Sequence, residues 1–162
     1  MTRVILLERL KAFTEDAISE LLLPTKMQKG DTEQEYRVAD VYKMRLPDST
    51  AAQKKAPYII HQLITAKDSQ PRGSLGESVA KIRSIFCVYS EDEQEGALLL
   101  LNLMERVRIA LLKERVVGSQ FELLLDDEGM EALIYPDDTA PYFAGEMVSN
   151  WRLPAVEREV IL

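Results

Sequence analysis

The chain has 162 residues, of which 46% are hydrophobic and 29% charged, and 20 basic against 27 acidic residues give a net charge of −7. These values are typical of one globular domain, and the acidic charge argues against a fold-wide attraction to nucleic acid. The apolar runs are too short to span a bilayer, and the charged N-terminus lacks the apolar core of a signal peptide.

Residues 2–23 have the spacing of an amphipathic helix. Thr2 is a suitable N-cap, and Pro24 is expected to end the helix. The apolar residues share one face: Leu6, Leu7, Leu10, Phe13, Ala17, Ile18 and Leu21. We therefore expect this helix to cover a sheet.

The segment 25–56 shows no sustained periodicity of apolar residues. Its middle, from Tyr36 to Leu46, suggests one or two short strands, whereas 47–55 is polar and small, as in a loop. We interpret 25–56 as a loop or hairpin insertion within a single domain that spans residues 1–162.

Two apolar strands are predicted next, at 58–65 and 79–89, with a loop at 66–77 between them. The only histidine, His61, lies inside the first strand and is interpreted as a structural histidine with satisfied hydrogen bonds. The only cysteine, Cys87, lies inside the second and is interpreted as a small core residue. One cysteine allows no internal disulfide, which fits an intracellular, reducing compartment.

A long helix over 90–117 has an unusually wide apolar surface. Ser90 and Glu93 form the pattern of a capping box, and Gly118 is the expected stop. The apolar positions cover an arc of roughly 220°, whereas a surface helix needs only about 100° to face its own core. We therefore expect a second contact, with another helix or a neighbouring subunit, and assign Leu98, Leu101 and Leu112 to an oligomer interface.

The last third of the chain is predicted to form β-strands. Residues 121–125 are expected to pair with 130–135 as a hairpin, and 142–153 to form a final strand that Pro154 ends. The order of elements predicts an α+β fold, in which a mostly antiparallel or mixed sheet is covered by two main helices, at about 2–23 and 90–117.

Catalytic chemistry is scarce in this sequence. No set of nucleophile, base and acid can be assembled, and no Cys/His metal spacing occurs, so we predict no catalytic residue, cofactor or metal. Two acidic groups stand at expected turns: Asp126, Asp127 and Glu128, then Asp137 and Asp138. A small metal-dependent enzyme is a remote alternative, which requires these carboxylates to converge in a pocket.

The C-terminal half carries a resemblance to a known family. A strand ends in Cys87-Val88-Tyr89-Ser90, and Glu95-Gly96-Ala97 opens a Leu-rich helix that contains Met104-Glu105-Arg106-Val107-Arg108. Pro141-Tyr142-Phe143-Ala144-Gly145-Glu146 then leads into Trp151-Arg152-Leu153-Pro154. This pattern resembles the tail terminator (tail completion) and neck proteins of long-tailed bacteriophages and prophages.

The resemblance implies a non-enzymatic virion assembly protein. Such a protein caps the tail tube and forms the tail side of the head–tail junction as a hexameric ring. Its implied partners are other copies of itself, the tail-tube protein and the head connector protein, with DNA passing through the lumen without specific binding and with no membrane. The implied location is the tail or neck of the virion, after assembly in the host cytoplasm. A head–tail joining (connector) protein is the alternative, and the sequence does not separate the two.

Overall fold

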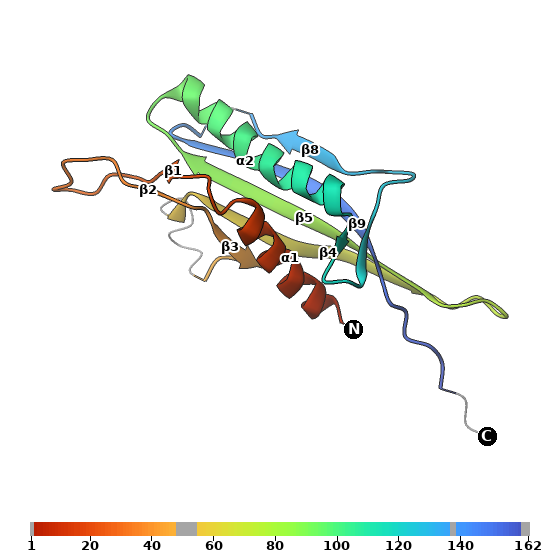
Figure 1. Cartoon of the computed structure of the whole chain (residues 1–162). Helices are drawn as coiled ribbons and strands as arrows, with labels where there is room; N and C mark the ends of the chain where they lie inside the picture. Colours follow the sequence, from red (N-terminus) through yellow and green to blue (C-terminus); the bar gives the residue numbers. More distant parts are fainter. Residues whose placement is uncertain (1, 48–54, 137–138, 160–162) are drawn as a thin grey trace.

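The computed structural model describes residues 2–47, 55–136 and 139–159 of the chain. The elements are, in order, α1 (Arg3–Ala17), β1 (Leu23–Pro24), β2 (Tyr36–Arg37), β3 (Asp40–Lys43), β4 (Tyr58–Ser69), β5 (Glu77–Tyr89), α2 (Glu93–Glu114), β6 (Val116–Val117), β7 (Phe121–Leu124), β8 (Glu131–Ile134) and β9 (Tyr142–Leu153). The fold is α+β, with both helices on one face of a curled sheet (Figure 1). The predicted fold class is therefore confirmed.

The sheet is built on its three longest strands. Its order is β3-β4-β5-β9-β7-β6, with β8 also paired to β9. The β5–β9 pair is continuous from Ser78 opposite Leu153 to Tyr89 opposite Tyr142. Among the described strands, β3 and β4 form the parallel pair and the other pairs are antiparallel, so the sheet is mixed.

Strand alternation places the main core between the sheet and the helices. In β5, Ile82 and Phe86 point to the helix side and are fully buried, as is Trp151 of β9. The opposite face of the sheet is covered at one end by a second, smaller cluster: Leu46, Ala56, Tyr58, Ile60, Cys87 and Tyr89. Over the rest of that face the β5 and β9 side chains are half-exposed, apart from the exposed Glu77 and Arg152.

The first helix is shorter than predicted, because it ends at Ala17 rather than near residue 23. Thr2 does cap it, accepting a hydrogen bond from the Ile5 amide at 3.3 Å. Beyond the helix Leu21 and Leu23 are buried while Leu22 is exposed, which is the alternation of an extended chain. Pro24 also disfavours helical geometry at Leu23, which instead pairs with Arg37 of β2.

The second helix also differs from its prediction at both ends. Asp92, rather than Ser90, is the N-cap, and its carboxylate accepts hydrogen bonds from the amides of Gln94 and Glu95. Ser90 instead bonds the backbone of Asp92, which fixes the approach to the cap. The helix stops at Arg115, which adopts left-handed φ of 62°, before the chain reaches Gly118.

One predicted loop and one predicted strand pairing are corrected. The loop expected at 66–77 is shorter, because β4 and β5 continue their ladder to Ser69 opposite Glu77. The hairpin expected between 121–125 and 130–135 does not form: β7 and β8 lie end to end along the same edge of β9. A strand of 12 residues offers room for both short strands on its free edge, so neither needs the other as a partner.

The segment 25–56 contributes two short strands, β2 and β3, and a projection. β1 and β2 form a separate two-stranded sheet, and residues 25–35 extend beyond it as an arm that leaves the body of the molecule (Figure 1). The predicted loop at 47–55 lies largely outside the described residues. In the described part of the chain, neither helix has the length and apolar character that crossing a bilayer requires.

Candidate interaction surface on the outer face of α2

The helix α2 is apolar on two opposite sides. Its inner side packs on the sheet and contains Leu100, Leu103, Val107 and Leu111, each at most 3% exposed. The opposite side carries Leu98, Leu101 and Ile109, which are 55%, 46% and 45% exposed. We call these three residues the outer row. Leu98 and Ile109 are 11 residues apart, about three turns, and therefore lie nearly above one another.

The outer row includes two of the three residues that the sequence assigns to an interface. Leu98 and Leu101 are exposed, whereas Leu112, which lies about three turns beyond Leu101 on the same side, is half-buried. Ile109 is not among the residues that the sequence assigns to the interface, although its spacing of 11 residues from Leu98 indicates that the two share one side of the helix. Between these residues, Arg108 and Glu105 form an exposed ion pair at 3.0 Å, so the face is apolar with a polar margin.

An open strand edge lies beside α2. All four residues of β8 are exposed, including Leu133 and Ile134. A Cβ atom at Gly145 of β9 would lie 3.1 Å from Met104 Sδ and 3.4 Å from Ile134 Cδ1, so β8 borders the inner flank of α2. Among the described strands β8 is paired on one side, with β9. Its other edge presents unpaired backbone groups that a strand of another chain can use.

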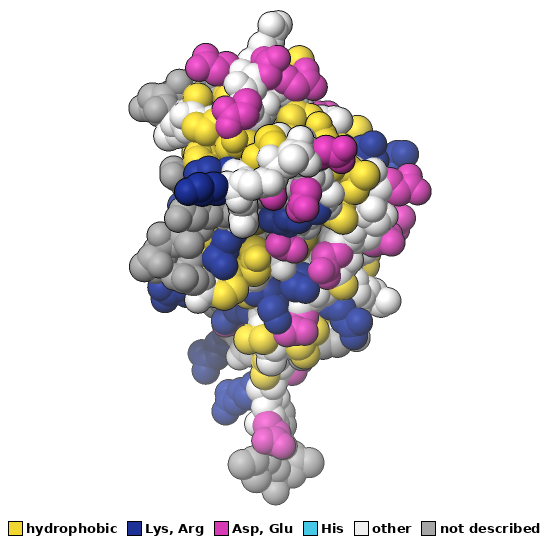
Figure 2. Space-filling view, turned by 90° about the vertical axis from the view of Figure 1, so that its left-hand side faces the viewer, with side chains coloured by type: hydrophobic (Ala, Val, Ile, Leu, Met, Phe, Trp, Pro, Cys, Tyr) yellow, Lys and Arg dark blue, Asp and Glu magenta, His cyan; other side chains and the backbone are white. Residues whose placement is uncertain are grey.

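Acidic residues surround the start of α2. Glu91, Asp92, Glu93 and Glu95 are all exposed. Figure 2, which views the end of the molecule from which the arm projects, shows carboxylates gathered at the top, with hydrophobic side chains directly beside them. Negative charge near a helix N-terminus is favourable for the helix itself, so this cluster has a sufficient structural explanation.

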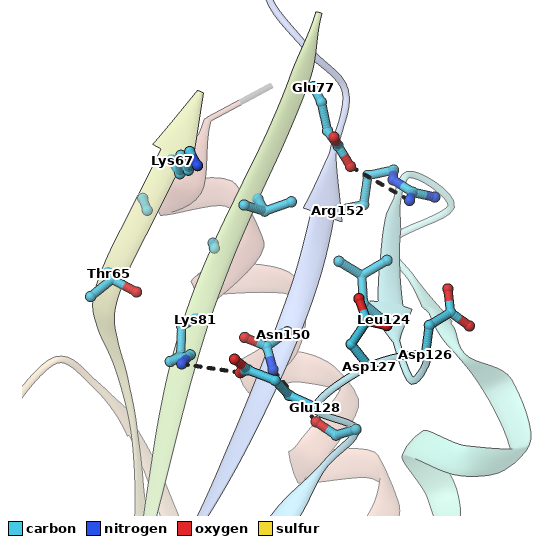
Figure 3. Close-up of a pocket in the computed structure, with 14 residues that line it drawn as sticks. Thr65, Lys67, Glu77, Lys81, Leu124, Asp126, Asp127, Glu128, Asn150 and Arg152 are labelled. Carbon is cyan, nitrogen blue, oxygen red and sulfur yellow. Dashed lines mark hydrogen bonds and ion pairs between the residues drawn. The ribbon is translucent and has the colours of Figure 1, made fainter. Parts of the chain in front are cut away.

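The first predicted carboxylate cluster borders a hollow on the helix-free face of the sheet. This hollow of about 580 Å³ lies between β4, β5, β9 and the loop that follows β7 (Figure 3). Glu128 forms an ion pair with Lys81 at 3.3 Å, while Asp126 is directed away from Glu128. Asp137 and Asp138 lie outside the described residues. Within the described residues no three His, Cys, Asp or Glu side chains are grouped to hold a metal.

His61 is a structural residue, as predicted. It is fully buried, with Nε2 2.8 Å from Thr14 Oγ1 and Nδ1 2.7 Å from Ser84 Oγ. The Thr14 hydroxyl already donates to the Leu10 carbonyl at 2.7 Å, so Nε2 donates to Thr14, and in the neutral ring Nδ1 then accepts from Ser84. This network holds a neutral imidazole, and burial lowers the pKa of His61 to about 3.

Cys87 is likewise a core residue, as predicted. It is 4% exposed and lies in the second cluster against Tyr58. Burial raises the pKa of the thiol to about 11 and also raises the pKa of the Tyr58 hydroxyl. A thiol held in this form is a poor nucleophile at neutral pH.

Comparison of the chain with known protein families and with curated protein sequences finds no match in either.

Proposed function

We propose that this protein is a structural subunit of a virus-like tail, which assembles into a closed ring on the end of the tail tube. It forms the tail side of the junction with the head, as the resemblance to tail terminator proteins implies. Ring formation is mediated by the outer row of α2. The protein acts through assembly, with no catalytic step.

The observation that carries this proposal is the position of the outer row. Leu98, Leu101 and Ile109 are exposed on the side of α2 that faces away from its own core, so packing within the subunit does not account for them. Exposed apolar groups that share one face of a helix are typical of a protein-binding surface. The open edge of β8 beside the same helix supplies a second group of contacts.

The charge of the chain is compatible with a conduit for DNA. A net charge of −7 repels phosphate groups, so DNA can pass a ring of such subunits without being retained. Ring closure requires a heterologous contact, in which two different surfaces of the subunit meet.

The proposal is tested by measuring assembly on a tail tube. The purified protein, with and without the tail-tube protein of the same gene cluster, is analysed by light scattering coupled to size-exclusion chromatography and by electron microscopy. We expect rings, alone or at tube ends, and tubes of fixed length. Leu101→Lys is expected to remain folded and to abolish ring formation, because it places a charge in the contact.

Ser19→Lys is the matched control, since it adds the same charge at an exposed turn after α1. It is expected to assemble like the natural protein. A strictly monomeric protein that leaves tube length unchanged would contradict the proposal. Binding to head-side connector rings instead of tubes would assign the protein to the connector class.

A further inference from the structure

We propose that the arm, residues 25–35, of one subunit lies in a groove between α1 and α2 of a second copy. This inference rests on the proposed function, because it names the surfaces through which the ring closes. Four observations support it: the exposure of the arm, the lining of the groove, the unpaired charges on both, and their positions on the molecule.

The arm is exposed and does not pack on the core of its own subunit. Residues 26–33 are all exposed, including Met27 at 41%. Its shape is held by internal hydrogen bonds, from the Thr25 amide to the Glu35 carbonyl at 2.9 Å and from the Asp31 amide to the Gln28 carbonyl at 3.0 Å. A segment whose shape is already held by internal hydrogen bonds loses less entropy when it docks, which favours binding.

The groove is lined by both apolar and charged side chains. It is a hollow of about 680 Å³ between α1 and the C-terminal half of α2. Its apolar lining includes Ala12 and Phe13 of α1 and Ala110 of α2. Ile109 of the outer row also lines it, so the groove is continuous with the surface that we assign to subunit contact.

The charges of the groove and of the arm are complementary. The groove carries three basic side chains, Arg9, Arg106 and Lys113, and two acidic ones, Asp16 and Glu114. The arm reverses this count, with three acidic side chains, Asp31, Glu33 and Glu35, and two basic ones, Lys26 and Lys29.

None of these ten side chains forms an ion pair within the described part of the chain. Other charged side chains on the same two helices are paired, as in Lys11–Glu15 and Arg108–Glu105. An arm and a groove whose charges lack internal partners and have opposite balance can satisfy each other between copies.

The two surfaces lie at different places on the subunit. The arm leaves from the end of the body at which α1 finishes, whereas the C-terminal half of α2 extends away from that end (Figure 1). This separation allows a head-to-tail contact, in which the arm of each copy docks on the next copy. Head-to-tail contacts close into rings when the rotation between subunits permits.

Disulfide capture tests this contact directly. A chain with Met27→Cys is mixed with a chain carrying Ala12→Cys, under mild oxidation and in the presence of tail-tube protein. We expect a covalent dimer at a yield at least about tenfold above that of the control mixture, Met27→Cys with Val4→Cys. Val4 is 64% exposed on α1 and does not line the groove, and the natural Cys87 is buried.

Charge reversal provides a second measurement. Glu33→Lys and Arg106→Glu are each expected to weaken assembly about tenfold, and the doubly substituted chain to recover most of the loss, because opposite charges again meet between copies. Both substitutions are on exposed side chains, so the variants are expected to keep the natural fold.

The outcomes separate the two proposals. Rings that form with unchanged affinity in the charge variants, and give no more cross-linking than the control, would overturn the arm contact while leaving the ring proposal intact. Arm-to-groove cross-linking without any effect on tail tubes would support the contact and contradict the tail function. Cysteine variants that do not cross-link, together with a natural protein that does not assemble, would contradict both.

Discussion

His61 Nε2 lies 2.8 Å from Thr14 Oγ1, and this hydrogen bond joins β4 to the last turns of α1 inside the core. Ser84 of β5 completes the network from the other ring nitrogen. Burial favours the neutral imidazole, in which Nε2 donates to Thr14, whose hydroxyl already donates to the Leu10 carbonyl, and Nδ1 accepts from Ser84. Protonation of His61 would therefore bury a positive charge at the contact between α1 and the sheet.

This network predicts that stability falls with acid. The pKa of His61 is lowered from its ordinary value of 6.5 to about 3, so between these values the unfolded chain binds a proton that the folded chain does not. The free energy of unfolding should fall by up to about 1.4 kcal/mol per pH unit over this window, and by about 2 to 3 kcal/mol between pH 7.5 and 4.5. Urea unfolding at several pH values measures it.

His61→Gln is the control for this effect. Glutamine cannot take up the proton, so the variant should be less stable at pH 7.5 but should lose the part of the pH dependence that His61 causes. Equal slopes for the two proteins between pH 6.5 and 4.5 would show that carboxylates alone control acid unfolding.

Gly96 determines how closely α2 approaches β9. A Cβ atom added there would lie 2.2 Å from Cε2 of Phe143, far inside van der Waals contact, and Phe143 is itself 4% exposed. Gly96→Ala should therefore lower the free energy of unfolding by about 1 to 3 kcal/mol, despite the better helix propensity of alanine. Chemical denaturation followed by circular dichroism provides the value.

The combined variant Gly96→Ala/Phe143→Leu tests the stated cause. The smaller side chain gives the new methyl group room, so the two substitutions together should cost less than the sum of their separate effects. Strict additivity would mean that the loss arises elsewhere than in this contact.

The two helices, their amphipathic faces and most strands were predictable, because each depends on the local period of the sequence. The second apolar side of α2 was predictable in the same way, because the helical positions of Leu98 and Leu101 lie outside the arc that faces the core. The pairing of β7 and β8 was not predictable in this way. Whether these strands pair with each other or with the free edge of β9 depends on contacts with a separate strand, which local periodicity does not show. The early end of α1 was missed for a similar reason, since burial of Leu21 and Leu23 in an extended chain outweighs their helical spacing.

The candidate surface was only partly accessible from sequence. Periodicity identifies apolar residues that a helix does not need for its own core, and thereby indicates Leu98 and Leu101. It cannot show that the arm remains unpacked or that charges on α1 and α2 lack partners, because both depend on contacts across the fold. Leu112 illustrates the limit: its phase places it near the outer row, but the adjacent structure half-buries it.

Arg115 is a strained helix end that glycine should relieve. Its φ of 62° lies in the left-handed region, where a side chain is unfavourable, and its amide still donates to the Leu111 carbonyl at 2.8 Å. Arg115→Gly keeps these backbone bonds and should raise the free energy of unfolding by about 0.5 to 1 kcal/mol. Arg115→Val, which tolerates this conformation least, should lower the melting temperature, and the opposite order would contradict a left-handed cap.

A lysine substitution should have a large effect on stability on the inner side of α2 and a small effect on the outer side. Val107 is fully buried against the sheet, so Val107→Lys places an unpaired ammonium in the core and should cost more than about 4 kcal/mol, enough to unfold many domains of this size. Leu98→Lys exchanges two good helix formers at a position 55% exposed, so the free energy of unfolding should change by less than about 0.5 kcal/mol. Thermal melts of the two variants measure the difference, and light scattering then shows whether folded Leu98→Lys has lost assembly. A large destabilisation by Leu98→Lys would mean that the outer row supports the subunit itself, which would remove the main reason for assigning it to a neighbour.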